Sequence, residues 1–253
     1  MSDYYTPQRT RNMYDPKSEK PFKLSRSKIE QFMNCPRCFY IDRRLGVSHP
    51  PGFPFNLNSA VDTLLKKEFD DYRLKQKPHP LMKKFGYSGV PFQHVNLDQW
   101  RDSLRRGISF HHKETNLIIT GGVDDVWVDA DGWLNIVDYK ATSKNGEVSL
   151  NADWQIGYKR QMEMYQWLFR QNGFKVSDTG YFVYCNGDTS LERFDSNLSF
   201  KISILPYSGN DSWVEDYIFK IKQALDLDEI PEHSDSCDYC AYHLAIAAVS
   251  NAR

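Results

Sequence analysis

The sequence lacks the features that would place the protein in a membrane or direct it out of the cell. No stretch of its 253 residues approaches the roughly 18–20 consecutive apolar residues of a membrane-spanning helix. Residues 1–20 are polar and aromatic, without the hydrophobic segment of a secretion signal. The net charge is only −1, so charge alone does not indicate nucleic-acid binding. We therefore expect a cytoplasmic protein without a membrane partner.

Cysteine is scarce, and four of the five cysteines form two short pairs. Cys35 and Cys38 make one Cys-x-x-Cys pair, and Cys237 and Cys240 make the other. Cys185 is isolated and fits a core position. In a reducing compartment such pairs predict metal ligands rather than disulfides. Because the pairs lie far apart in the sequence, a shared metal would join both ends of the domain.

Hydrophobic residues make up 40% of the chain and aromatic residues 14%, which is enough for a packed core. We expect an N-terminal tail at 1–22, which contains three prolines, and a single domain at 23–253. The spacing of apolar residues predicts an α/β fold, with a mixed central β-sheet flanked by helices. The expected helices span residues 24–45, 59–75, 153–171 and 213–227, and the expected strands span 179–185 and 198–205 in addition to a central hairpin.

The central hairpin is expected within residues 117–140, where Asp131-Gly132 lies between two apolar, β-branched runs. Side chains alternate along a strand, so Asp138 and Lys140 point the same way. If the loop is 130–132, residue 129 pairs with 133 and Asp124 lies opposite Asp138. A two-residue turn would instead bring Asp125 to that position.

Two carboxylates and an ammonium on one patch of a sheet suit a specific chemistry. Paired carboxylates bind hard cations such as Mg²⁺ or Mn²⁺. A neighbouring lysine can orient or deprotonate a water and can stabilise charge on a phosphoryl oxygen. Asp124, Asp138 and Lys140 therefore predict metal-dependent phosphodiester hydrolysis. The alternative is a hairpin whose acids and lysine merely lie on a solvated face.

The motifs resemble a known family. Gly121-Gly122-Val123-Asp124 followed by Ile136-Val137-Asp138-Tyr139-Lys140 resembles the PD-(D/E)XK nuclease superfamily. Gln161-Met162-Glu163-Met164-Tyr165 matches the Gln-x-x-x-Tyr motif of its RecB-like branch, which includes CRISPR-associated RecB-like exonucleases. The resemblance implies a restriction-endonuclease-like core, with Gln161 and Tyr165 beside the active site as catalytic and substrate-binding residues.

The resemblance extends to both kinds of metal site. Many RecB-like nucleases have a metal-binding histidine where this chain has Asp62, which could replace it or could simply favour the start of its helix. The backbone carbonyl of Tyr139 is a further expected ligand. The segment around Cys35 also resembles the signature of iron–sulfur RecB-like nucleases, which implies a 4Fe–4S cluster. Those relatives usually supply one early and three late cysteines, so zinc is the alternative here, with His243 as a further candidate ligand.

We therefore predict a Mg²⁺- or Mn²⁺-dependent deoxyribonuclease of exonuclease type, with DNA as its substrate. We expect it to act in DNA repair, recombination or processing, in a complex with a protein partner. Two other classes remain open: a nucleic-acid-binding module with a degenerate site, and a metal-clasped interaction subunit. Neither of these two classes requires the combination of Asp-x-Lys with Gln-x-x-x-Tyr, so the two motifs favour the nuclease.

Overall fold

The computed structural model of the chain describes residues 8–52 and 55–251, and it divides into two compact units. Of the described residues, 8–52, 111–119 and 212–251 form unit 1. Residues 55–110 and 120–211 form unit 2. Each unit brings together segments that are far apart in the sequence.

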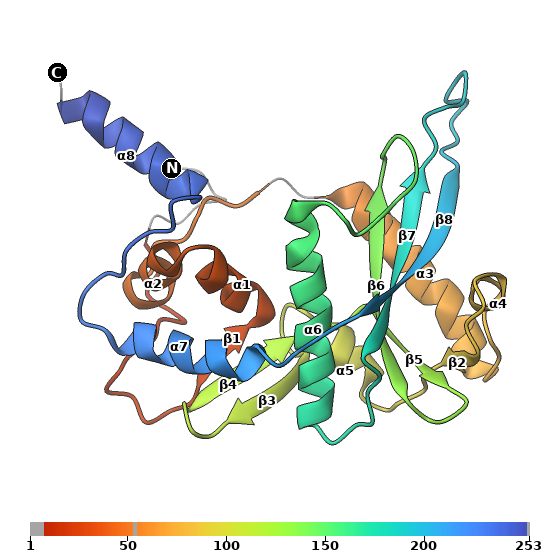
Figure 1. Cartoon of the computed structure of the whole chain (residues 1–253), viewed down its shortest axis with the longest axis horizontal. Helices are drawn as coiled ribbons and strands as arrows, with labels where there is room; N and C mark the ends of the chain where they lie inside the picture. Colours follow the sequence, from red (N-terminus) through yellow and green to blue (C-terminus); the bar gives the residue numbers. More distant parts are fainter. Residues whose placement is uncertain (1–7, 53–54, 252–253) are drawn as a thin grey trace. The chain divides into compact units, whose positions relative to one another are not determined.

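Unit 2 is built on a five-stranded mixed sheet, with the strand order β2-β5-β6-β7-β8 (Figure 1). The central strands β6 and β7 are parallel, and the other neighbours are antiparallel. The expected mixed sheet is thus confirmed. The strands are β2 (Gly89–Pro91), β5 (Asp125–Asp129), β6 (Leu134–Thr142), β7 (Thr179–Gly187) and β8 (Phe200–Ser208).

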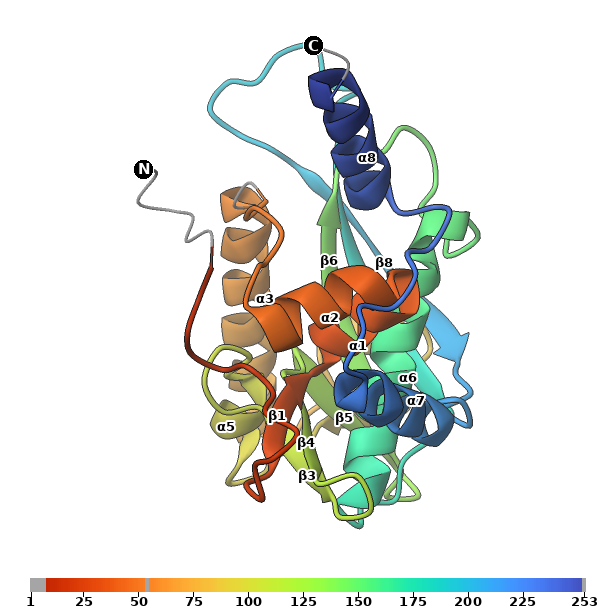
Figure 2. The same cartoon turned by 90° about the vertical axis from the view of Figure 1, so that its left-hand side faces the viewer.

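Two long helices, α3 (Asn56–Leu74) and α6 (Ile156–Gln171), flank this sheet on opposite sides (Figures 1 and 2). Both contact the central strand β6. A 3-10 turn, η1 (Asp153–Gln155), precedes α6, and the short helices α4 (Pro80–Lys84) and α5 (Leu97–Arg101) lie between α3 and β5 in the sequence. The expected α/β architecture with flanking helices is therefore present.

Alternation along β6 divides its side chains between the two flanking helices. Val137 and Tyr139 join a buried core with Leu65 and Phe69 of α3. The intervening residues Asp138 and Lys140 face the opposite side of the sheet. The same alternation that builds the core therefore directs an acid and a lysine toward α6.

The first run of the expected hairpin is not one strand. Its beginning is β4 (Leu117–Gly121), which lies between β1 (Phe22–Ser25) and β3 (Ile108–His112) in a separate three-stranded sheet. The chain leaves β4 at Gly122, where a Cβ atom would lie 2.4 Å from the Cβ of Ser103. Only glycine fits this close approach, and β5 begins three residues further on, at Asp125.

Unit 1 contains α1 (Arg26–Asn34), α2 (Pro36–Leu45), α7 (Val214–Asp226) and α8 (Asp238–Asn251). The rings of Phe32 in α1 and Phe39 in α2 meet edge to face, with centroids 5.3 Å apart. The helical segment expected over 24–45 is interrupted at Cys35, as the proline that follows predicts, because proline lacks the amide hydrogen that an uninterrupted helix needs. No helix within the described ranges is long and apolar enough to cross a membrane.

A closed ring of four ion pairs joins α3, α5 and β5 in unit 2. Arg73 Nη2 lies 2.5 Å and Arg101 Nη2 3.0 Å from Asp125 Oδ1. Both arginines also bind Asp70, through Arg101 Nη1 at 2.8 Å and Arg73 Nε at 3.0 Å. Asp125 is fully buried, so its charge depends on these donors.

Replacing Asp125 with asparagine should therefore lower the free energy of unfolding by about 3–5 kcal/mol, because two arginines lose their buried counter-charge. Equilibrium unfolding in urea measures this loss. Asp71→Asn, an exposed acid on the same helix as Asp70, serves as the control and should change stability by less than about 0.5 kcal/mol. Equal stability of the two variants would contradict a structural role for the ring.

Candidate active site and cysteine cluster

The pairing of β5 with β6 brings two acids together. Asp125 pairs with Val137 and Val128 with Leu134, so the same register places Asp124 opposite Asp138. The predicted register is thus confirmed, and the alternative with Asp125 opposite Asp138 is not present. Asp125 belongs to the ion-pair ring, whereas Asp124 immediately precedes the strand.

Asp138 is 1% exposed and is held from two sides. Its Oδ2 lies 2.5 Å from Lys140 Nζ, and its Oδ1 accepts a hydrogen bond from Gln161 Nε2 at 2.8 Å. Burial lowers the pKa of Lys140, but the charge of Asp138 outweighs it and the pKa is raised. Lys140 is therefore an ammonium at neutral pH. In this form it can orient a water or stabilise an anion.

The orientation of Asp124 is fixed at both its backbone and its side chain. Arg101 Nε donates to its carbonyl oxygen at 3.0 Å. The backbone amide of Tyr139 donates to its Oδ2 at 2.9 Å. The phenol of Tyr139 in turn donates to buried Asp125 at 2.8 Å. The ion-pair ring therefore also positions the residues on which a metal site would depend.

Asp62 reaches the same region from α3. Lys66 Nζ lies 2.8 Å from Asp62 Oδ2 and 3.3 Å from Asp124 Oδ1, so one ammonium bridges the two acids. Asp62 Oδ1 is buried and has no hydrogen-bond partner among the described residues. Burial and the charge of Asp124 raise the pKa of Asp62 despite Lys66. A buried carboxylate oxygen without a donor, like the carboxylate oxygens of Asp124 and Asp138, is of the chemical type that hard cations bind.

Gln161 and Tyr165 lie one helical turn apart on α6. Gln161 Nε2 is 3.3 Å from the Tyr165 hydroxyl, and Gln161 Oε1 is 3.5 Å from Lys140 Nζ. Tyr165 is 4% exposed, and its ring packs against Gly121, where an added Cβ atom would lie 2.5 Å from Tyr165 Cε1. The geometry connects Tyr165 to the acid pair through Gln161.

A pocket of about 320 Å³ lies beside Lys140. Phe55, Tyr158 and Asp62 contribute to its lining, and Lys140 Nζ lies 4.3 Å from the centre of the Tyr158 ring. Sequence analysis missed Tyr158 and Lys66. Lys66 could have been found, because it follows Asp62 by four residues, the spacing at which helical side chains pair.

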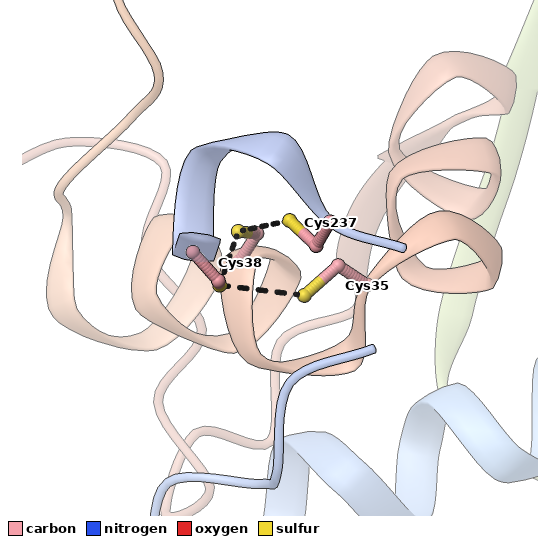
Figure 3. A group of neighbouring side chains, drawn as sticks. Cys35, Cys38 and Cys237 are labelled. Carbon is pink, nitrogen blue, oxygen red and sulfur yellow. Dashed lines mark hydrogen bonds between the residues drawn. The ribbon is translucent and has the colours of Figure 1, made fainter. Parts of the chain in front are cut away.

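The four paired cysteines meet in unit 1. Cys35 lies at the break between α1 and α2, and Cys38 lies in the first turn of α2. Cys237 immediately precedes α8, and Cys240 lies in its first turn. Figure 3 shows the side chains of Cys35, Cys38 and Cys237 turned toward one another.

The four sulfur atoms are close enough to share a metal. The Cys38 sulfur lies 3.6 Å from that of Cys237 and 3.5 Å from that of Cys240, and the Cys35–Cys240 distance is 3.8 Å. Among the described residues, this is the only group of at least three metal-ligating side chains whose donor atoms all lie within 4.8 Å. His243 is not in the group, although it lines a neighbouring pocket with Cys38 and Cys240.

The pKa values of three of these thiols, Cys35, Cys38 and Cys240, are shifted in different directions. Burial raises the pKa of Cys35, but hydrogen bonds from the backbone of Cys38 and Ser234 and from neighbouring thiols outweigh it and lower the pKa to about 7. Burial raises the pKa of Cys240 to about 11, and that of Cys38 is raised further for the same reason. Cys35 can therefore form a thiolate at neutral pH, whereas Cys38 and Cys240 require a bound cation to ionise. The donor set thus fits a thiophilic metal.

The mixed sheet of unit 2 is flanked by helices and carries the Asp-x-Lys motif on its central strand β6, with Asp124 opposite Asp138. The sequence model of the PD-(D/E)XK nuclease superfamily matches residues 57–244, about three quarters of the chain. The chain belongs to this superfamily.

The chain can also be compared with curated proteins and with solved structures. No curated protein matches it. A solved structure described as "Crystal structure of SSO0001" is 13% identical, covers 90% of this chain and 86% of that chain, and gives a TM-score of 0.36.

The contact between Gly121 and Tyr165 gives a test of the packing beneath the acids. Gly121→Ala should lower the free energy of unfolding by about 1–3 kcal/mol, because the new methyl group overlaps the Tyr165 ring. Gly187→Ala is the matched control, since a Cβ atom there would meet its nearest neighbour at an ordinary 3.6 Å. Urea unfolding of both variants compares them, and similar stability would contradict the close packing.

Proposed function

We propose that the protein is a divalent-metal-dependent DNA nuclease that hydrolyses phosphodiester bonds. The observation that carries this proposal is the pairing of Asp138 with Lys140, opposite Asp124 on the same face of the sheet. Membership of the PD-(D/E)XK superfamily supports a nuclease. The RecB-like resemblance of the motifs supports the exonuclease type and a role in DNA repair, recombination or processing, with a protein partner.

Asp124 and Asp138 would hold Mg²⁺ or Mn²⁺, together with Asp62 and the carbonyl oxygen of Tyr139. A cation bound there polarises a phosphoryl oxygen and lowers the pKa of a bound water. The Lys140 ammonium orients the attacking water and stabilises the charge that develops on the phosphoryl group. Gln161 fixes the positions of both Asp138 and Lys140, which keeps the reactive groups preorganised.

The pocket beside Lys140 supports a nucleic-acid substrate. The rings of Phe55 and Tyr158 provide surfaces on which a base can stack, a contact typical of proteins that bind unpaired strands. The phosphate next to a base held there would lie near Lys140. This arrangement supplies local recognition that the overall charge of −1 does not.

Asp138→Asn and Lys140→Gln should each reduce cleavage at least a hundredfold, because the first weakens the proposed cation site and the second removes the ammonium that stabilises charge on the phosphoryl group. End-labelled single- and double-stranded DNA is incubated with Mn²⁺, Mg²⁺ or EDTA, and the product ladder distinguishes exonuclease from endonuclease action.

Asp131→Asn, in the exposed turn between β5 and β6, is the control and should cleave normally. Thermal melting checks that every variant is folded. Cleavage that persists in a folded Lys140→Gln protein would overturn the assignment. Metal-independent DNA binding without cleavage by the wild-type protein would instead favour a degenerate binding module, and neither binding nor cleavage would favour an interaction subunit.

For the cysteine cluster we propose a single zinc ion rather than a 4Fe–4S cluster. Four thiolates around one zinc, each about 2.3 Å from it, lie about 3.8 Å apart at the corners of a tetrahedron. Three of the six sulfur–sulfur distances are 3.5–3.8 Å, close to this spacing, and all four sulfur atoms lie within 4.8 Å of one another. A 4Fe–4S cluster places each thiolate on a different iron, which requires a wider separation. The zinc would connect α2 to the start of α8 within unit 1.

Protein purified without oxygen should therefore be colourless and contain about one zinc per chain, as elemental analysis and an absorption spectrum would show. Cys38→Ser should lose the zinc and lower the melting temperature, because the ion contributes to folding. Cys185→Ser, which removes the fifth cysteine, is the matched control and should retain the zinc. A brown wild-type protein containing iron and labile sulfide would contradict the zinc assignment.

A further inference from the structure

Lys66 occupies a position that the proposed reaction does not explain. It follows Asp62 by one turn of α3, and its ammonium contacts both Asp62 and Asp124. The Asp-x-Lys motif already supplies Lys140, whose ammonium binds the third acid, Asp138. Two lysines therefore divide three carboxylates between them.

The charges explain why an ammonium is stable at this position. Asp62 and Asp124 are both partly buried, and without a cation between them their negative charges would repel each other. Lys66 lies between them and offsets this repulsion. Arg101 cannot take its place, because its three nitrogens bind Asp70, Asp125 and the carbonyl of Asp124.

A divalent cation and the Lys66 ammonium would require the same oxygen atoms. Mg²⁺ lies about 2.0–2.1 Å from its oxygen ligands. Lys66 Nζ is already 2.8 Å from Asp62 Oδ2 and 3.3 Å from Asp124 Oδ1, so a cation bound to both would face a like charge at close range. The lysine side chain is 21% exposed and has a flexible four-carbon stem, so it can move out toward solvent.

We propose that Lys66 is a tethered competitor of the divalent cation: it holds Asp62 and Asp124 together when no metal is bound and is displaced when metal binds. This inference rests on the proposed nuclease function, because it concerns the same carboxylates. Its consequence is that the resident ammonium weakens metal binding. The metal concentration at which the site fills is therefore set by a lysine as well as by the acidic ligands.

Mn²⁺ binding to the full chain tests this inference without reference to activity. Lys66→Gln removes the competing charge at nearly constant length, and the Mn²⁺ dissociation constant should fall by about fivefold or more, which is the lower range of typical coupling between two ligands. Titration followed by the electron paramagnetic resonance signal of free Mn²⁺ measures the constant. Lys66→Arg, which keeps the charge, should not tighten binding.

Lys67→Gln is the matched control, since it removes the same charge from an exposed neighbouring position on α3 and should leave the dissociation constant within twofold of the wild-type value.

Asp124→Asn identifies binding at the proposed site. Loss of binding in Asp124→Asn, with unchanged or weaker binding in Lys66→Gln, would overturn only the role of Lys66. Wild-type binding that Asp124→Asn leaves intact would overturn both the metal site and the competition. If Lys66→Gln and Lys67→Gln tightened Mn²⁺ binding equally, the cause would be the change in net charge rather than the position of Lys66, and the proposal would also be overturned.

Discussion

The register between β5 and β6 is the constraint on which the candidate active site depends. Because Asp125 pairs with Val137, Asp124 lies opposite Asp138, and Lys140 follows on the same face. A shift of one residue would turn Asp124 away and would place Asp125 opposite Asp138. Asp125 could not bind a metal opposite Asp138 without losing the five hydrogen bonds that it accepts in the core. Their donors belong to Arg73, Arg101, Val126, Trp127 and Tyr139.

The register and the ion-pair ring support each other. Asp125 can be buried only because its neighbours supply two guanidinium groups, and those groups are available because α3 and α5 lie against the start of β5. One of them, Arg101, also binds the carbonyl oxygen of Asp124. Adjacent acids in the sequence thus have different roles: Asp125 fixes the elements in place, and Asp124 is presented at the site. Metal sites generally depend on such contacts, which hold the metal-binding residues in position without touching the metal.

Much of this arrangement was predictable from local pattern. Asp131-Gly132 between β-branched runs identified the turn, and alternation along the strand then gave the pairing of Asp124 with Asp138. The spacing of the cysteine pairs identified a group that the structure brings together. The break between β4 and β5 was not predictable, because β4 pairs with β1 and β3 whereas β5 pairs with β2 and β6, and local pattern does not show which strands a segment will pair with. The ring was missed for the same reason: Arg73 and Arg101 resemble ordinary surface arginines until the fold places them beside Asp125.

A divalent-metal site at Asp124 and Asp138 can be located by the anomalous scattering of Mn²⁺ in crystals of the protein. We expect a manganese peak bonded to oxygen atoms of both Asp124 and Asp138, with the Lys66 ammonium moved away from Asp124. A manganese peak found only elsewhere in well-diffracting crystals, with these two side chains still bound to Lys66 and Lys140, would contradict it.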